Sequence, residues 1–496
     1  MGYAAGQHEF PAERTDAMPT NDLTLKLLLA ACCLGLMLTA PARADDRDDA
    51  PPNIVYIMAD DLGYGALGCY GQTKIHTPRI DRMAAEGMRF TQCYAGSHVC
   101  QPSRSVLMTG LHTGHTPVRA NDIQQFLRPQ DTTVAKLLQE RGYATGGFGK
   151  WGLGFEGTPG HPNLQGFDEF FGQYLQVHAH FYYPYWLNHN DRKHMLPGNE
   201  GGKREQYVQD VIHEQALEFI RSNHEGPFFA YLPYIIPHVE LVVPEESEAP
   251  YRGKFPKISI QDPRAGYIGS EDGLTTLAGM ISRLDAQVGE VLDLLVELGI
   301  DDNTIVIFTS DNGGQSGGKD RGWTKMTDYF EANGPLRGYK GTFYEGGLRV
   351  PFIARWPGKI PAGTTSDHIC GFWDMLPTFC DLAGIEPPTE TDGISIAPTL
   401  TGSGIQRQHL GIYWEYARRN GIGRAARMGN WKAVQANPNG PVELYDLSTD
   451  ISERWNVADG NPAIVRQITA FMDGAHTAPR EITTDFERTT VKDYVR

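Results

Sequence analysis

The chain has 496 residues, enough for one large domain and a smaller one built around an ample hydrophobic core. Hydrophobic residues make up 40% of it and charged residues 21%, with 56 glycines and 32 prolines, as in a loop-rich globular protein. The formal net charge of −16 argues against a nucleic-acid partner, because a phosphate-binding surface needs a basic excess or stripe. An anionic substrate would need positive charge concentrated at one site.

The N-terminus predicts a cleavable export signal. Lys26 precedes the apolar run LLLAACCLGLMLTA, and an A-x-A pattern ends at Ala44. A membrane anchor is the alternative, but the run is short for a spanning helix. We therefore assign residues 1–44 to an N-terminal extension and signal peptide. The mature protein is expected to be periplasmic or secreted, without stable membrane insertion.

Five cysteines remain after removal of the signal, and an odd number in an oxidising compartment indicates one unpaired thiol. They are Cys69, Cys93, Cys100, Cys370 and Cys380. The sequence does not determine which of them pair, although Cys370 and Cys380 are close along the chain.

Short apolar stretches recur along the chain, and each stops at polar residues near a glycine or a turn. The stretches are NIVYIM before Asp60 and Asp61, ATGGFGKWG around Lys150, PFFAYLPYIIPH up to His238, and NTIVIFTSDNGG with Asp311 and Asn312. Between the last two lies a helical pattern with apolar residues three and four apart over 277–295. Strands that alternate with helices predict an α/β fold with a mostly parallel central sheet flanked by helices.

The pattern changes near residue 400. Residues 409–434 alternate like antiparallel strands, and residues 461–474 are typical of a helix. We therefore expect a main domain over residues 45–400 and a smaller C-terminal α+β subdomain, with an antiparallel sheet, over residues 401–496.

Two of the strand ends carry oxygen ligands for a metal. In a parallel sheet, ligands gather outside the carboxyl ends of the strands, where Asp60, Asp61, Asp311 and Asn312 are expected. Each pair alone would be interpreted as a turn or a helix cap. Together they favour a site for Ca²⁺ or Mg²⁺ rather than zinc, which prefers histidine and cysteine.

The stretch SHVCQPSRSVLMTG places Cys100 at the start of a predicted helix. Pro102 is favoured in the first helical turn, whose unpaired N–H groups attract anions. Arg104, about one turn on, offers a fixed fork for an oxyanion. An unmodified thiol in this position is expected to have a low pKa and to act as a nucleophile.

At these residues the sequence resembles the sulfatase family, in the alkaline-phosphatase superfamily. The C-x-P-S-R stretch, the later TG and the ordered set of motifs match from about Asn53 to the C-terminal YDLSTDISERWN. The resemblance implies an alkaline-phosphatase-like fold and a catalytic domain over residues 45–400. It also implies a sulfuric ester hydrolase that acts on a sulfated carbohydrate or an aryl sulfate. In that family a formylglycine-generating enzyme, or an equivalent, oxidises the cysteine to formylglycine before the chain folds.

The resemblance also assigns roles residue by residue. One Ca²⁺ per chain, with Mg²⁺ as the alternative, would be bound by Asp60, Asp61, Asp311, Asn312 and an oxygen of modified Cys100. The other matching positions are Lys150 and Lys340, which would hold the sulfate, His238, near the leaving group, and Arg104, which would steady the formylglycine. One hydroxyl of the aldehyde hydrate would attack sulfur, and the other would expel sulfate as the aldehyde re-forms.

One position departs from the family. The family commonly has GKWHLG, whereas this chain has GKWGLG, with Gly152 where the histidine is expected. His178 or His180, in a stretch rich in histidine and aromatic residues, could supply the imidazole on the substrate side; the alternative is that both are structural. Two other functions stay open: a phosphonate or phosphoester hydrolase of the same superfamily, and a catalytically dead glycan-binding protein.

Overall fold

The computed structural model describes residues 51–481 except 262–265, 318–321 and 419–420. The predicted signal peptide lies outside the described residues. Within them, none of the helices combines the length and the apolar character needed to cross a bilayer.

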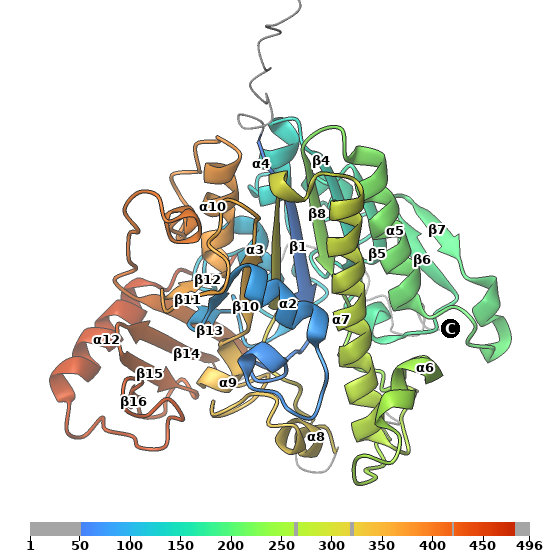
Figure 1. Ribbon diagram of the computed structural model, residues 1–496. Coiled ribbons are helices and arrows are strands. Elements are labelled where there is room, and N and C mark those ends of the chain that lie inside the picture. Colours follow the sequence, from blue (N-terminus) through green and yellow to red (C-terminus); the bar gives the residue numbers. More distant parts are fainter. Residues whose placement is uncertain (1–50, 262–265, 318–321, 419–420, 482–496) are drawn as a thin grey trace, which may run out of the picture. The chain divides into compact units, whose positions relative to one another are not determined.

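A ten-stranded sheet forms the centre of residues 51–481 (Figure 1). In spatial order its strands are β11 (Thr364–Ser366), β2 (Met88–Phe90), β10 (Phe352–Arg355), β9 (Thr304–Ser310), β1 (Asn53–Ala59), β8 (Phe228–Pro233), β4 (Ala144–Lys150), β5 (Glu169–Gln173), β6 (Trp186–His189) and β7 (Arg192–Met195). The five strands from β9 to β5 are mutually parallel, and β10, β6 and β7 run antiparallel to their neighbours. The predicted mostly parallel α/β sheet is confirmed.

Both faces of the sheet are covered by helices. Along β1, Val55 and Ile57 belong to the hydrophobic cluster of α2 (Pro78–Glu86), α5 (Val208–Asn223) and α7 (Gly273–Glu297). The alternate residues, Ile54 and Tyr56, belong to the cluster of α3 (Cys100–Thr109), α4 (Val134–Glu140) and α10 (Met375–Leu382). A strand buried on both faces has no polar alternation, which explains why NIVYIM is a continuous apolar run.

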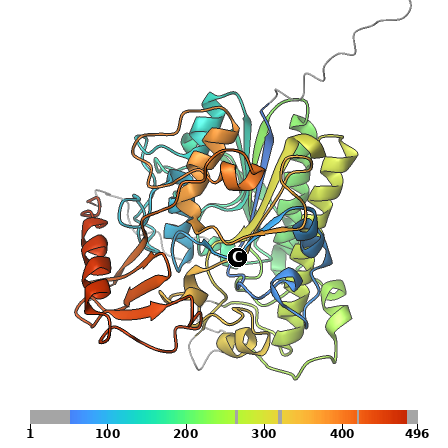
Figure 2. The same cartoon turned by 60° about the vertical axis from the view of Figure 1, so that its left-hand side comes forward.

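A four-stranded antiparallel sheet follows near the C-terminus. It consists of β13 (Ile412–Arg418), β14 (Gly421–Met428), β15 (Trp431–Gln435) and β16 (Glu443–Asp446), and α12 (Pro462–Gly474) packs on it through Ile468 and Met472 (Figure 2). The predicted antiparallel subdomain is therefore present; its boundary near residue 400 stays a prediction.

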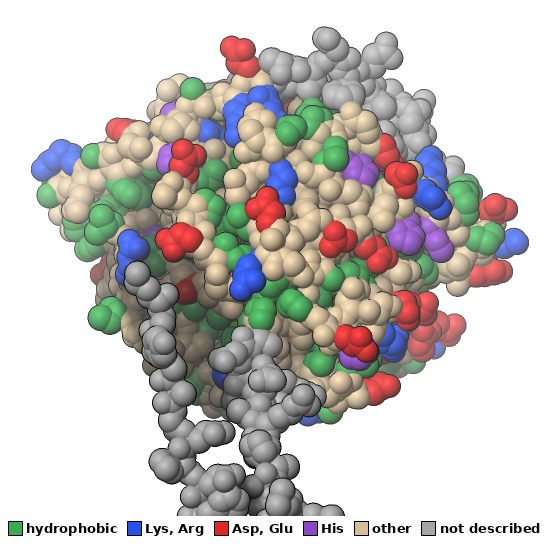
Figure 3. All heavy atoms as spheres, turned by 90° about the horizontal axis from the view of Figure 1, so that it is seen from above, with side chains coloured by type: hydrophobic (Ala, Val, Ile, Leu, Met, Phe, Trp, Pro, Cys, Tyr) green, Lys and Arg blue, Asp and Glu red, His purple; other side chains and the backbone are tan. Residues whose placement is uncertain are grey.

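Short elements complete the described chain. They are α6 (Glu245–Glu248), α8 (Trp323–Tyr329), α9 (Glu345–Leu348), α11 (Ala397–Thr401), strands β3 (Cys93–Tyr94) and β12 (Cys370–Gly371), and the 3₁₀ helices η1 (Gly68–Tyr70), η2 (Pro162–Gln165), η3 (His178–His180), η4 (Pro197–Gly202), η5 (Ala249–Tyr251), η6 (Asp301–Asn303) and η7 (Phe372–Asp374). The described cysteines are all free thiols, and Cys370 lies opposite Cys93 in the parallel β12–β3 pair rather than beside Cys380. On the face shown in Figure 3, basic and acidic side chains of described residues are interspersed rather than gathered by sign.

Candidate functional site

The polar residues predicted at the strand ends converge at the carboxyl edge of the parallel strands. Asp60 and Asp61 directly follow β1, Asp311 and Asn312 follow β9, and Lys150 is the last residue of β4. All five are buried, so the three carboxyl groups and the ammonium among them are isolated from solvent. Since β1 lies between β8 and β9 in the sheet, the chain segments after these strands meet beside Asp60 and Asp61.

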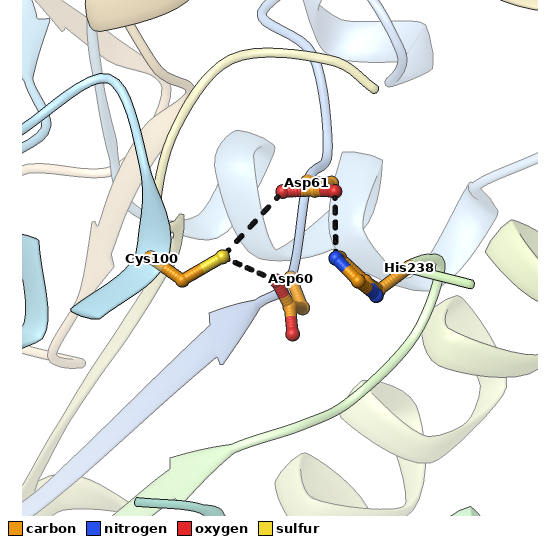
Figure 4. Close-up of side chains that lie close together, drawn as sticks. All are labelled: Asp60, Asp61, Cys100 and His238. Atoms are coloured by element: carbon orange, nitrogen blue, oxygen red, sulfur yellow. Dashed lines mark hydrogen bonds and ion pairs between the residues drawn. The ribbon is translucent and has the colours of Figure 1, made fainter. Parts of the chain in front are cut away.

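Cys100 begins helix α3 and points at the two aspartates (Figure 4). Its Sγ lies 3.6 Å from Asp60 Oδ1 and 4.0 Å from Asp61 Oδ1. Burial raises the pKa of the Cys100 thiol well above its usual value, against the lowering effect of Lys150 and Lys340. The expectation that the unmodified thiol has a low pKa is therefore wrong, because desolvation and nearby carboxylates outweigh the helix N-terminus.

Arg104 and Lys150 are buried cations that bind the carboxylates of the cluster. Arg104 Nη2 donates to Asp311 Oδ2 at 2.7 Å, and its Nη1 donates to the carbonyl oxygen of Lys150 at 2.7 Å. Lys150 Nζ donates to Asp60 Oδ2 at 2.6 Å. Burial alone would raise the pKa of Asp60, but the charges of Lys150, Arg104 and Lys340 hold it well below the usual range. The carboxylate of Asp60 is therefore ionised at neutral pH.

Lys340 and His238 form the other side of the cluster. Lys340 Nζ lies 2.7 Å from Asp61 Oδ2 and 2.9 Å from His238 Nε2. Burial lowers the pKa of His238 well below its usual value, and the neighbouring charge of Lys340 lowers it further. His238 is thus a neutral imidazole that accepts from Lys340 at Nε2 and keeps its own proton at Nδ1, 3.2 Å from the carbonyl oxygen of Val239.

The oxygen atoms of this cluster fit a hard divalent cation. Asn312 Oδ1 is buried and has no hydrogen-bond partner among residues 51–481 as described, while Asn312 Nδ2 donates to Asp61 Oδ1 at 2.7 Å. Burial raises the pKa of Asp61 to about 7, and the nearby carboxylates of Asp60 and Asp311 contribute to the rise. An orphaned amide oxygen beside mutually repelling carboxylates is the donor set expected of a Ca²⁺ or Mg²⁺ site.

A cavity of about 280 Å³ opens beside this cluster. Its polar lining includes Cys100, Gln176, His180, His238 and Lys340, and Gly152 forms part of its wall. The apolar part of the lining is Ile123, Leu175 and Val177. The cavity is thus lined by both polar and apolar side chains, as binding sites for small organic molecules commonly are.

The two candidate histidines of η3 lie in different surroundings. The ring of His180 stacks on that of His238 with centroids 4.4 Å apart, its Nδ1 lies 2.8 Å from the Tyr267 hydroxyl, and it lines the cavity. His178 is buried against Trp186, with ring centroids 4.3 Å apart, and is outside the residues that line the cavity. The structure therefore brings His180, but not His178, to the site.

His178 makes stability depend on pH. Burial, aided by Lys193, lowers the pKa of His178 to about 3, although a hydrogen bond to the backbone of Trp186 raises it. Below pH 6.5 the unfolded chain gains a proton that the folded chain excludes, so this contribution is lost as the pH falls from 6.5 toward 3. We expect a loss of up to about 1.4 kcal/mol per pH unit. Urea unfolding at pH 7 and pH 5 measures how much of the free energy of unfolding is lost between the two pH values. The loss should be smaller in His178→Phe than in the wild type; equal losses in the two proteins would contradict the role of His178.

Comparisons with known proteins point to one family. A family model described as sulfatase matches residues 52–385, and one described as N-sulphoglucosamine sulphohydrolase, C-terminal, matches residues 339–474. N-acetylgalactosamine-6-O-sulfatase of Bacteroides thetaiotaomicron is 30% identical and covers 87% of this chain and 94% of its own. Arylsulfatase A of Homo sapiens is 32% identical, and the match covers 83% of this chain and 84% of that protein. The solved structure of Ps i-CgsB in complex with k-i-k-neocarrahexaose has a TM-score of 0.71 at 30% identity, with 85% and 92% covered.

Proposed function

This chain belongs to the sulfatase family of sulfuric ester hydrolases. We therefore propose that residue 100 works as a formylglycine beside one divalent cation. The family hydrolyses sulfated glycans or aryl sulfates, and we propose a substrate of one of these two classes for this protein. The observation that carries the proposal is the position of Cys100, which faces two buried aspartates at one end of the cavity. A formylglycine-generating enzyme, or an equivalent, would modify the cysteine before folding buries it.

The metal would be held by the four oxygen-bearing side chains after β1 and β9. These are Asp60, Asp61, Asp311 and Asn312, with residue 100 as a further ligand once it carries oxygen. The proposed ion is Ca²⁺, with Mg²⁺ as the alternative. When bound, it would supply positive charge to the reacting anion. The unpartnered Asn312 Oδ1 supports this assignment because a buried acceptor without a donor is costly unless a ligand satisfies it.

The chemistry of sulfate release favours an aldehyde over a thiol at residue 100. A protonated, buried thiol is a poor nucleophile, so the cysteine itself is unsuited to attack sulfur. The hydrated aldehyde would supply a hydroxyl for attack and a second one whose proton loss releases sulfate.

The cations of the site would stabilise the charge that develops as the S–O bond breaks. Lys340 lines the cavity and would hold a sulfate oxygen. Lys150 is outside the residues that line the cavity, and its Nζ donates to Asp60 Oδ2; its proposed role at the sulfate and the leaving oxygen rests on the family resemblance. Arg104 donates to Asp311 and to the Lys150 carbonyl oxygen, and would so keep both residues in position. His238 lines the cavity and accepts a hydrogen bond from Lys340, and its neutral ring would lie near the leaving group. Preorganised charges of this kind commonly account for most of an enzyme's acceleration.

The experiment that tests this function compares two chromogenic esters. We expect the matured protein to turn over nitrophenyl sulfate well and nitrophenyl phosphate poorly, and peptide mass analysis around residue 100 to show an aldehyde. Faster turnover of the phosphate ester would favour a phosphoester or phosphonate hydrolase. Plain cysteine at residue 100 in protein from its native host, without turnover, would favour a glycan-binding protein.

Removal of the metal should destabilise the folded chain. Buried carboxylates repel one another, and a bound cation relieves that repulsion only in the folded state. Adding Ca²⁺ at about 100 times its Kd to chelator-treated protein should stabilise it by about 2.7 kcal/mol, seen as a rise in Tm. Asn312→Ala serves as the control, because loss of one ligand should shift the response to higher Ca²⁺ concentrations. A Tm unchanged by both Ca²⁺ and Mg²⁺ would contradict the site.

We also propose that the protein is exported, and is periplasmic or secreted. The support is the sequence pattern of residues 26–44, with a lysine, an apolar run and an A-x-A site. N-terminal sequencing of the mature protein from its host tests this directly, with Asp45 expected as the first residue.

A further inference from the structure

The segment that follows β5 lies beside Gly152, which is in the segment that follows β4. Trp151 N donates to the carbonyl oxygen of Gln173 at 3.0 Å, and Gly152 N donates to that of Tyr174 at 2.9 Å. These bonds continue the parallel β4–β5 pairing past the ends of both strands. Gln176 follows two residues after Tyr174 and so lies against Gly152 at the wall of the cavity.

The Gln176 carboxamide occupies the space that a side chain at position 152 would need. A Cβ built on Gly152 would collide with Gln176 Nε2 and lie 3.1 Å from its Cδ. Gly152 also has φ +82°, a conformation that residues with a Cβ rarely adopt. Because residue 152 has no side chain, the Gln176 amide can occupy this space.

The amide nitrogen of Gln176 is a hydrogen-bond donor without an acceptor among the described residues. Nε2 is buried and makes no hydrogen bond within the described part of the chain. Buried N–H groups normally have an acceptor, so one without a protein partner points to a ligand oxygen. Gln176 shares its cavity with Cys100, His238 and Lys340, where an anion would be bound.

We propose that Gln176 is a further catalytic residue, whose Nε2 donates a hydrogen bond to an oxygen of the bound sulfate group. It would do so from beside Gly152, and the inference rests on the proposed function. A carboxamide is not basic, so Gln176 holds the anion without taking up a proton. Its hydrogen bond is therefore independent of pH over the working range.

Two variants separate donation from space filling. Gln176→Met keeps the length of the side chain and removes the donor, and Gln176→Glu keeps the shape and adds a negative charge. Gln130→Met, at an exposed position outside the cavity lining, is the matched control. The matured, Ca²⁺-loaded enzymes would be compared by calorimetric titration with inorganic sulfate and by kcat/KM on nitrophenyl sulfate.

For Gln176→Met we expect the Kd of inorganic sulfate to rise, and kcat/KM to fall, by about 10-fold to 100-fold. Gln176→Glu should raise the sulfate Kd and lower kcat/KM by more than Gln176→Met, because its carboxylate repels the anion. Values within about twofold of the control variant for both Gln176 variants would overturn the inference, as would a wild-type protein that binds no sulfate. If wild-type binds sulfate but hydrolyses no sulfate ester, the proposed function fails while the sulfate Kd of the variants still decides the role of Gln176.

Discussion

Replacing Cys100 with serine should reduce kcat on nitrophenyl sulfate by about 10⁴-fold or more. Serine has one hydroxyl and is not expected to be converted to the aldehyde in this protein, so it lacks the second hydroxyl whose proton loss releases sulfate. Attack on sulfur, if it occurred at all, would leave a sulfate ester that only water could remove. Serine is close in size to cysteine, and the buried start of α3 should accept it with little rearrangement.

The control for this variant is Cys380→Ser. Cys380 is also buried on a helix, α10, but lies outside the cavity lining. The Cys380→Ser variant should have a lower free energy of unfolding than the wild type, and its kcat should stay within about threefold of wild type. Single-turnover measurements would show whether Cys100→Ser still forms one equivalent of product. A Cys100→Ser enzyme with more than about 1% of wild-type turnover would rule out the aldehyde as the source of the reaction's rate.

The central sheet and most of the site were predictable because the information is local. A run such as NIVYIM is apolar at every position since both faces of β1 are buried, and the polar pair Asp60 and Asp61 marks where that burial ends. Parallel strands then force such ends to one edge of the sheet. The same reasoning places Asp311 and Lys150 at this edge without knowledge of the packing.

Other features depend on contacts between distant segments, which the sequence does not display. The helix N-terminus alone would lower the thiol pKa of Cys100, but burial beside Asp60 raises it. His178 and His180 are two residues apart, and only the packing of η3 shows that one meets Trp186 and the other meets His238. Glycine at position 152 signalled a missing side chain. Nothing local indicated that Gln176, 24 residues later, fills the space.

Replacing Lys340 with methionine should lower kcat/KM on sulfate esters by about 100-fold to 1,000-fold. Lys340 is the lysine that lines the cavity, and its ammonium is fixed between Asp61 and His238. Burial lowers its pKa, but Asp61 and the other anionic groups raise it more, so the side chain stays charged at every working pH. Methionine keeps the length and removes the charge. Lys340→Arg should retain part of the activity, because the charge remains while its geometry changes.

Lys432→Met separates loss of charge at the site from loss of a buried ion pair. Lys432 is fully buried, and its Nζ lies 2.8 Å from Glu345 Oε1 and 3.1 Å from Glu453 Oε1, outside the cavity lining. Its replacement should lower the free energy of unfolding by about 3–5 kcal/mol, because two buried carboxylates lose the ammonium that they share, although Glu345 keeps Arg349 as a cationic partner. Below its Tm, however, kcat/KM should stay within about threefold of wild type. If instead both variants lost activity in proportion to their loss of stability, Lys340 would act through the fold and not on the sulfate.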